Sequence, residues 1–188
     1  MIIESLVTTM DAAGQVNLAP MGVEWGEAIV LKPFLDTTTF RNLVATRSAV
    51  LHLTDDVLLF VQAALGEPRF AWRPAASVQG AVLDDACSWR ELEVTTIDDT
   101  PPRARIVTRV ATQGEGREFL GFNRARHAVL EGTILATRLH LIPADEVSEQ
   151  FARLAIPVEK TAGPREREAW NWLTEFVRAR GVSVSATA

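Results

Sequence analysis

The order of the secondary-structure elements constrains the fold of this chain more than any other feature of its sequence. Residues 2–9 are rich in residues that favour strands, residues 11–14 form a turn that contains a glycine, and residues 15–24 resume the extended pattern. This predicts that the chain opens with a β-hairpin. A third strand is expected at residues 27–31, and a proline two positions later ends it.

Two short helices with a strand between them are expected next. Apolar positions spaced by three and four residues predict a helix that starts after the polar run 36–39. A compact apolar run at residues 49–54 predicts a buried strand, and a second helix is expected over residues 57–65 with Gly66 at its end. Because these elements do not alternate as regular βαβ units, a doubly wound parallel sheet is not expected.

The strand pattern returns in the middle of the chain and gives way to helices near its end. A turn is expected at residues 114–116, and residues 139–142 fit either the end of a helix or a last strand. The sequence therefore predicts an α+β protein, mainly β, with an antiparallel barrel-like sheet and C-terminal helices. The further elements expected are strands at residues 88–97 and 103–112 and helices at residues 123–139, 144–154 and 164–180.

Composition and charge exclude several classes of protein. The 188 residues are 47% hydrophobic and 23% charged, which is typical of a globular chain, and the formal net charge of −5 argues against a general nucleic-acid binder. The longest uncharged hydrophobic run, residues 57–66, is about half of the roughly 20 residues that a membrane span needs. Without a basic n-region or cleavage site, a cytoplasmic location is expected. Cys87 and three histidines form no recognisable zinc motif.

Three consecutive threonines, residues 37–39, stand at the start of the first expected helix. The N–H groups and the dipole at a helix N-terminus favour an anion, and the hydroxyls add donors. Lys32, Arg41 and Arg47 against Asp36 give this segment a local charge of +2. The segment is a candidate site for a phosphate monoester. The alternative is a helix that is merely capped by Asp36 or by the first threonine.

A second segment, residues 14–22, places an asparagine and an Ala-Pro pair on the second expected strand. Pro20 cannot donate a hydrogen bond to a strand partner, so it belongs at an edge or at a bulge. A flat ring could lie against such backbone. The alternative is an edge strand with no ligand.

Together these two segments resemble the FMN-binding split-barrel superfamily, the fold of pyridoxamine-phosphate-oxidase-like proteins and flavin reductases. Residues 2–22 and 124–139 also look like segments of an uncharacterised subgroup of that superfamily known from methanogens and methylotrophs, so the resemblance spans most of residues 1–142. The residues that match the superfamily motifs are Asn17, Ala19 and Pro20 and then Lys32, Asp36, Thr37 and, with an offset, Asn42.

The resemblance implies a split antiparallel β-barrel, FMN as cofactor and a homodimer with the flavin at the subunit interface. It also implies a flavin reductase-like oxidoreductase that uses NAD(P)H or another electron donor; a non-catalytic dimeric module that binds flavin or another ligand is the alternative. Because three threonines and a Pro-Phe-Leu insertion depart from the motif, the threonine that contacts phosphate is left open. The expected ligands are Asn17, Ala19 and Pro20 for the ring and Lys32, Thr37, Thr38, Thr39, Arg41 and Asn42 for the ribityl chain and phosphate.

The last conspicuous pattern lies in the expected helix at residues 123–139. Arg124, His127, Glu131 and Arg138 fall on one helical stripe, and Arg124 and His127 are candidate ligands for the FMN phosphate or for an acidic substrate. The alternative is a solvated face on which Glu131 pairs with His127 or Arg138. His52, in an apolar strand, is interpreted as a hydrogen-bonded core or flavin-neighbour histidine and not as a general base.

The expected domain organisation follows from these elements. Residues 1–142 form the FMN-binding barrel, residues 143–181 form a C-terminal helical extension packed on it, and residues 182–188 form a disordered tail.

Overall fold

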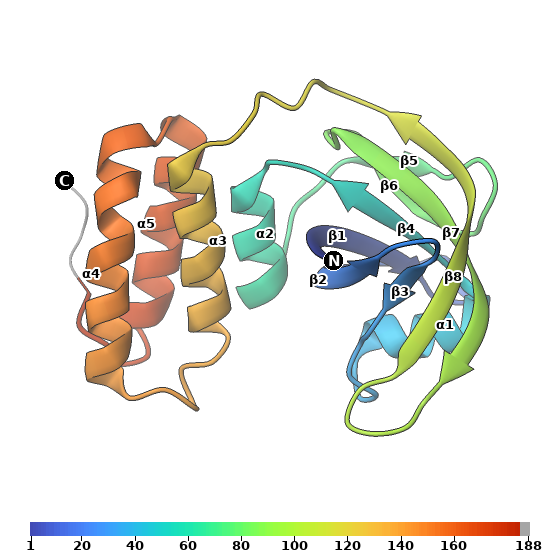
Figure 1. Ribbon diagram of the computed structural model, residues 1–188, viewed down its shortest axis with the longest axis horizontal. Coiled ribbons are helices and arrows are strands. Elements are labelled where there is room, and N and C mark those ends of the chain that lie inside the picture. Colours follow the sequence, from blue (N-terminus) through green and yellow to red (C-terminus); the bar gives the residue numbers. More distant parts are fainter. Residues whose placement is uncertain (185–188) are drawn as a thin grey trace. The chain divides into compact units, whose positions relative to one another are not determined.

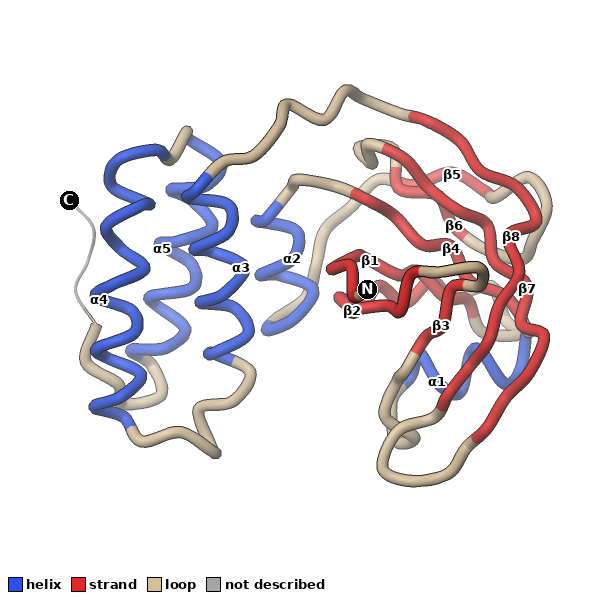
Figure 2. Tube along the Cα trace, in the orientation of Figure 1, coloured by secondary structure: helices blue, strands red, loops and turns tan. Residues whose placement is uncertain are grey.

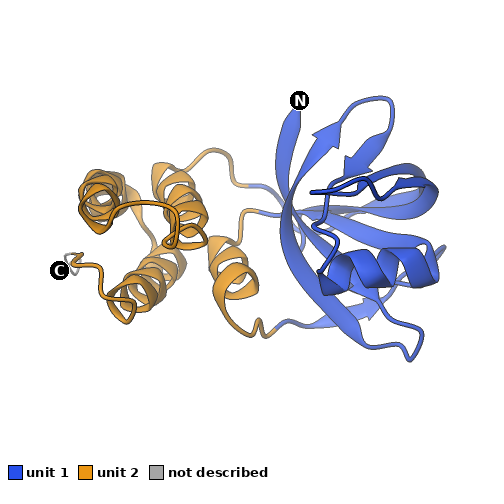
Figure 3. Cartoon of the chain, turned by 90° about the horizontal axis from the view of Figure 1, so that it is seen from below, with its two compact units in different colours: residues 1–54, 70–119 blue, residues 55–69, 120–188 orange. Residues whose placement is uncertain are grey.

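The computed structural model describes residues 1–184, which form two compact units (Figure 3). The first, here called the barrel unit, consists of residues 1–54 and 70–119. The second, here called the helical unit, consists of residues 55–69 and the described residues from Leu120 onward.

The barrel unit contains all eight strands and one helix, and the helical unit contains the other four helices (Figure 1). The strands are β1 (Ile2–Met10), β2 (Val16–Trp25), β3 (Ile29–Leu31), β4 (Ser48–Leu53), β5 (Trp72–Pro74), β6 (Ala81–Leu83), β7 (Ser88–Asp98) and β8 (Arg105–Glu115). The helices are α1 (Thr38–Thr46), α2 (Val57–Leu65), α3 (Arg124–Ala136), α4 (Ala144–Thr161) and α5 (Pro164–Arg178). None of the helices among the described residues is long and apolar enough to cross a bilayer.

Six strands close into a barrel in the order β1-β2-β3-β8-β7-β4, with antiparallel neighbours throughout. The remaining two strands, β5 and β6, form a separate two-stranded sheet. The predicted α+β class with an antiparallel barrel is therefore confirmed. Its apolar core is built by side chains from all six barrel strands and from α1, among them Val7, Val23, Leu31, Leu43, Leu51, Leu92 and Ile106.

Strand β2 pairs with two neighbouring strands at its C-terminal end but with only one along the rest of its described length. In the described structure β2 pairs with β1 from Val16 to Glu24, but with β3 only at Glu24 and Trp25. Pro20 lies in the singly paired part, opposite Leu6 of β1, where its missing N–H costs no ladder hydrogen bond on the open side. This part of β2 is called the open edge below.

The helical unit is a bundle in which α2, which lies between β4 and β5 in the sequence, joins three C-terminal helices (Figure 2). Its core holds Phe151 and Trp170, whose ring centroids lie 5.4 Å apart. Gly132 of α3 allows the close approach of α5, because a Cβ there would lie 2.8 Å from Cδ2 of Leu173. The apolar face of each helix is thus buried within the unit.

Ion pairs to buried carboxylates hold the starts of three helices in this unit. Arg126 of α3 forms an ion pair with Asp55 and donates from Nε to Glu166 of α5 at 2.8 Å. Arg165 reaches the N-cap of α2, Asp56, at 2.6 Å. Ion pairs as well as apolar packing therefore connect α2, α3 and α5, which are far apart in the sequence.

Several expected elements differ from the observed ones. The turn expected at residues 114–116 is wrong, because β8 continues to Glu115 against β7. Residues 139–142 form turns and no strand. The helix expected to end at residue 154 continues to Thr161 through Pro157, since Val158 lies seven positions after Phe151 and is buried in the same core. The short strands β5 and β6 were not predicted.

The compact units also divide the chain at other positions than the expected boundary at residue 142. The break after β8 falls at residues 119–120, because the apolar side of α3 packs with α4 and α5. Of the expected disordered tail, Val182 is buried in the helical core and the carbonyl of Val184 accepts two hydrogen bonds from Arg178, at 2.8 and 2.7 Å. The described part of that segment is therefore ordered by packing, which corrects the expectation. Residues 185–188 lie outside the described residues.

Candidate functional site

The start of α1 is a capped helix N-terminus in the barrel unit. Thr37 is the N-cap: its Oγ1 accepts a hydrogen bond from the N–H of Phe40 at 3.2 Å and donates to the carbonyl of Phe34 at 2.7 Å. The N–H of Thr37 donates to the same carbonyl at 3.2 Å. The turn from Phe34 to Thr37 therefore sets the direction in which the helix begins.

A guanidinium lies over the same turn. Arg41 donates from Nη1 to the carbonyl of Asp36 at 2.8 Å and from Nη2 to Oγ1 of Thr38 at 2.9 Å, and the side chains of Thr38 and Arg41 are exposed. The N–H groups in the first turn of a helix have no acceptor within that helix. Thr37, Thr38 and Arg41, here called the α1 turn, thus bring a cation and the exposed Thr38 hydroxyl to a helix N-terminus, which is a site suited to an anion.

The other two phosphate candidates from α1 point inward. Thr39 and Asn42 are buried, and each joins a hydrogen-bond network with β1 and β2. Asn42 donates from Nδ2 to Oγ1 of Thr9 at 3.1 Å, and Asn17 donates from Nδ2 to Oγ1 of Thr39 at 3.1 Å and of Thr9 at 3.4 Å. The structure therefore brings Asn17, Thr39 and Asn42 together, through Thr9.

The two cations expected on either side of α1 already have partners. Lys32 forms an ion pair with Glu24, and this hydrogen bond lowers the pKa of the Glu24 carboxyl below its ordinary value. Arg47, at the end of α1 with φ of 56°, donates to the carbonyls of Val94 and Thr95 at 3.3 and 3.2 Å. The local charge of +2 counted in the sequence is thus reduced at Lys32 by a nearby carboxylate.

One cation beside the α1 turn could not be expected from local sequence. Arg103 lies with its guanidinium carbon 3.9 Å from the ring centroid of Phe34, and it donates to the carbonyl of Lys32 at 3.4 Å. Arg103 follows Pro102, about 70 positions along the chain from these partners, so no spacing rule links them. Thr9, by contrast, could have been found from the hairpin register, which pairs it with Asn17.

The ring candidates lie on the open edge of β2. Ala19 and Pro20 pair with Val7 and Leu6 of β1, and their side chains are half-buried. Successive residues of a strand face opposite sides, so Ala19 shares the inward side of Asn17 while Pro20 faces the other way. The backbone on the open side carries N–H and C=O groups, apart from the missing N–H of Pro20.

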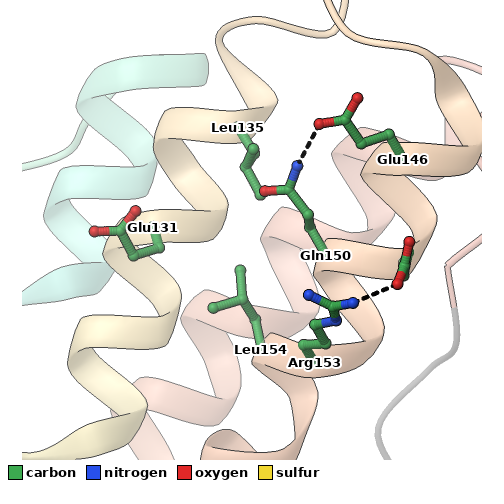
Figure 4. A pocket seen from close by; sticks show the side chains of 7 residues that line it. Glu131, Leu135, Glu146, Gln150, Arg153 and Leu154 are labelled. Carbon is green, nitrogen blue, oxygen red and sulfur yellow. Dashed lines mark hydrogen bonds and ion pairs between the residues drawn. The ribbon is translucent and has the colours of Figure 1, made fainter.

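Arg124 and His127 belong to the helical unit and are exposed on α3. The His127 ring meets the Phe122 ring edge-on at 5.9 Å. The expected pairing of Glu131 with His127 or Arg138 is absent from the described structure. Glu131 instead lines a groove of about 410 Å³ between α3 and α4, in which Gln150 bonds Glu146 and Arg153 bonds Glu149 (Figure 4).

His52 is fully buried and both of its ring nitrogens are occupied. The N–H of Leu83 donates to Nε2 at 3.1 Å, so Nδ1 carries the proton that is shared with the carbonyl of Leu6 at 3.1 Å. Burial lowers the pKa of His52 from 6.5 to about 4. The interpretation as a hydrogen-bonded core histidine is confirmed. The described residues also contain no cluster of three or more potential metal ligands.

Sequence comparison matches both units to one family. Residues 3–115 match the N-terminal domain, and residues 123–175 the second part, of the family described as "Protein of unknown function (DUF447)". The chain belongs to the DUF447 family. The gap between the two DUF447 matches contains the break between the compact units at residues 119–120.

Solved structures with the same fold include another DUF447 protein. The FMN-bound DUF447 protein from Methanosarcina mazei superposes with a TM-score of 0.80 at 23% identity, over 93% of this chain and 94% of that one. The flavin reductase of styrene monooxygenase from Pseudomonas putida matches with a TM-score of 0.52 at 14% identity, over 60% of this chain and 77% of that one. An FMN-binding protein from Thermus thermophilus with bound 1-cyclohex-2-enone matches with a TM-score of 0.53 at 15% identity, over 60% of this chain and 70% of that one. This DUF447 chain therefore shares the flavin reductase-like barrel fold.

Proposed function

We propose that this DUF447 protein binds FMN on its barrel unit and acts as a flavin reductase-like oxidoreductase, as a homodimer. The observation that carries the proposal is the α1 turn, in which the exposed Thr38 hydroxyl and the Arg41 guanidinium meet at a helix N-terminus. The FMN bound in the DUF447 relative from Methanosarcina mazei, whose structure matches over 93% of this chain, supports FMN as the anion concerned.

The donor set of the α1 turn fits a phosphate monoester. A guanidinium and hydroxyl groups offer charge-assisted hydrogen bonds to phosphate oxygens, and the helix dipole adds a favourable field. No side chain of this set is buried, so a phosphate there keeps part of its hydration. The half-exposed Lys32 is paired with Glu24, so its charge adds little to the positive field of this donor set.

The open edge of β2 is the proposed place for the flavin ring. Backbone N–H and C=O groups on the side without a strand partner are free to meet the polar edge of a ring, and Pro20 presents an apolar surface. Arg124 and His127 are exposed on α3 of the helical unit, and each remains a proposed contact for a phosphate or for an acidic substrate.

The chemistry that FMN supplies when bound is hydride transfer from a reduced donor, here of the NAD(P)H class, to an acceptor. The residues of this chain bind the phosphate, orient the ring along β2 and exclude water on the barrel side. His52 takes no part in proton transfer, since both of its ring nitrogens are hydrogen-bonded and its pKa of about 4 keeps it neutral. Any proton exchanged at neutral pH therefore comes from a group other than His52.

A non-catalytic flavin-binding module is the second candidate, and one observation favours it. The buried histidine of the barrel unit, His52, has both ring nitrogens hydrogen-bonded within the protein and offers no free acid or base. A barrel without a histidine available for proton transfer is suited to holding a cofactor.

The first experiment is a titration of the purified protein with FMN, followed by flavin fluorescence, with light scattering to give the mass of the complex. We expect saturable binding and the mass of a dimer. Anaerobic mixing of the complex with NADH or NADPH should then bleach the visible flavin absorbance within seconds. Absence of FMN binding would refute the whole proposal. Binding of FMN without its reduction by either donor would refute the oxidoreductase and support the non-catalytic flavin-binding module.

A further inference from the structure

Four polar side chains from three elements meet in the barrel unit beneath α1. Thr9 of β1 is fully buried, and its Oγ1 accepts from Nδ2 of Asn42 at 3.1 Å and from Nδ2 of Asn17 at 3.4 Å. Asn17 also donates to Oγ1 of Thr39 at 3.1 Å. Because one amide nitrogen bonds both hydroxyls, Asn17 connects β1 to the first turn of α1.

The network determines how α1 is rotated about its own axis. Thr39 and Asn42 are three positions apart and therefore share a face of the helix, and Leu43 beside them is fully buried in the barrel core. Turning the helix would leave amide donors without partners in the barrel interior, which is costly. Thr38 is one position, or roughly 100°, away from Thr39, and so its hydroxyl is directed outward to meet Arg41.

We infer that Asn17 is a positioning residue for the phosphate: through Thr9 and Thr39 it holds the first turn of α1 so that the N–H groups, the Thr38 hydroxyl and Arg41 face one anion. The inference rests on the proposed function. It differs from the expectation that Asn17 faces the flavin ring, because the Nδ2 group of Asn17 already donates to two threonine hydroxyls.

The pair of ligands FMN and riboflavin separates these two roles. The two molecules share the ring and the ribityl chain, and only FMN carries the phosphate. A residue that positions the phosphate turn changes the affinity for FMN and leaves the affinity for riboflavin unchanged. A residue that contacts the ring changes both affinities by the same factor, and a general loss of stability changes both as well.

The experiment measures both affinities in Asn17→Ala, Thr9→Val and Thr9→Ser, after thermal melting has established that each variant folds. We expect Asn17→Ala and Thr9→Val to lower the FMN affinity about tenfold, the effect of one weakened charge-assisted hydrogen bond, with the riboflavin affinity unchanged. Thr9→Ser keeps the acceptor hydroxyl and should retain the wild-type ratio of the two affinities. Thr108→Val is the matched control, because it removes another buried hydroxyl, bonded to the carbonyl of Ile29 at 2.7 Å, that has no part in the network.

Each other outcome overturns the inference. Equal losses for FMN and riboflavin in Asn17→Ala would place Asn17 at the ring, and no loss for either ligand would make the network irrelevant to binding. If Asn17→Ala does not fold, the difference between Thr9→Val and Thr9→Ser decides the question. A wild-type protein that binds no FMN would refute the proposed function itself, whereas wild-type binding with an unchanged ratio in the variants refutes only the role of Asn17.

Discussion

The two units bury polar groups in different ways. In the helical unit the buried carboxylates are paired with arginines: Arg126 lies between Asp55 and Glu166, and the exposed Arg165 bonds Asp56. In the barrel unit most buried polar side chains are neutral, such as the threonines and asparagines beneath α1 and His52, and one buried carboxylate is held by backbone N–H groups. The buried carboxylates of the helical unit thus hold helices together through arginines, whereas Arg41 of the barrel unit lies at the exposed start of α1, where a ligand can reach it.

The largest expected effect is the removal of a buried cation from the helical unit. Arg126→Leu removes the arginine with which both Asp55 and Glu166 pair, and the side chains of these two carboxylates are only 3% and 8% exposed. Breaking such a pair from one side costs about 3–5 kcal/mol of unfolding free energy, and the partial exposure of Arg126 favours the lower end. Urea unfolding measures the loss, and hydrogen exchange read by peptide should locate it in α2, α3 and α5.

The control for this variant is Arg153→Leu, which removes an exposed arginine paired with Glu149 along α4. A pair of this kind contributes about 0.5 kcal/mol or less. Equal effects of the two variants would contradict the view that charges in the helical unit are structural.

A smaller effect on the unfolding free energy is expected from the buried, neutral His52 of the barrel unit, and this effect depends on pH. The native pKa of His52 is about 4 and its unfolded pKa is 6.5, so between these values the unfolded chain binds more protons than the native chain. The stabilising contribution is therefore complete above pH 6.5 and is lost as the pH falls toward 4, by about 3 kcal/mol in all.

Comparison with His52→Asn isolates this contribution, because the other titrating groups are common to both proteins. The unfolding free energy of the variant should fall less steeply than that of the wild type between pH 6.5 and 4. Parallel curves would show that His52 is protonated as easily in the native barrel as in the unfolded chain.

The two units also differ in how much unfolding free energy is lost when a glycine is replaced by alanine, and these losses are expected to be smaller still. A Cβ at Gly114 of the barrel unit would lie 2.2 Å from the ring of Trp89, whereas a Cβ at Gly132 of the helical unit would meet the end of the Leu173 side chain at 2.8 Å. Gly114→Ala should cost about 2 kcal/mol through overpacking. Gly132→Ala should cost about 1 kcal/mol or less, because alanine favours the helix. Gly26→Ala, where the nearest atom lies 3.9 Å away, is the control; a loss there as large as at Gly114 would refute the steric explanation.

Local patterns in the sequence predicted most of the elements, because each pattern reports on one segment at a time. The hairpin, the helix at residues 57–65 and the long strand pair all follow from periodicity and from capping residues. The assignment of α2 and α3 to a unit with α4 and α5 could not be predicted, since an amphipathic helix does not specify which apolar surface covers it. The short strands β5 and β6 carry no periodic signal over three residues.

The candidate site was predicted as a segment and not as a set of contacts. The run of threonines indicated a helix start, but only the fold shows that Thr39 turns inward to Asn17 while Thr38 stays exposed beside Arg41. The pairing of Lys32 with Glu24 depends on the register between β2 and the residues after β3. Counting charges along the sequence cannot separate a cation with a partner from one that is available.

The central claim is that the α1 turn of the barrel unit binds the FMN phosphate, and Arg41→Met tests it with the least disturbance. The side chain is exposed, so stability should change by less than about 0.5 kcal/mol. Arg109→Met removes one exposed cation elsewhere in the barrel unit, where it pairs with Glu93, and serves as the charge-matched control.

The most direct measurement is therefore the ratio of the FMN and riboflavin affinities in the wild type, in Arg41→Met and in Arg109→Met. The wild type and Arg109→Met should bind FMN more tightly than riboflavin. Arg41→Met should lose about tenfold of that preference, the effect of one charge-assisted hydrogen bond. Equal affinities for the two ligands in the wild type, or an Arg41→Met variant with the wild-type ratio, would contradict the assignment of the phosphate to this turn.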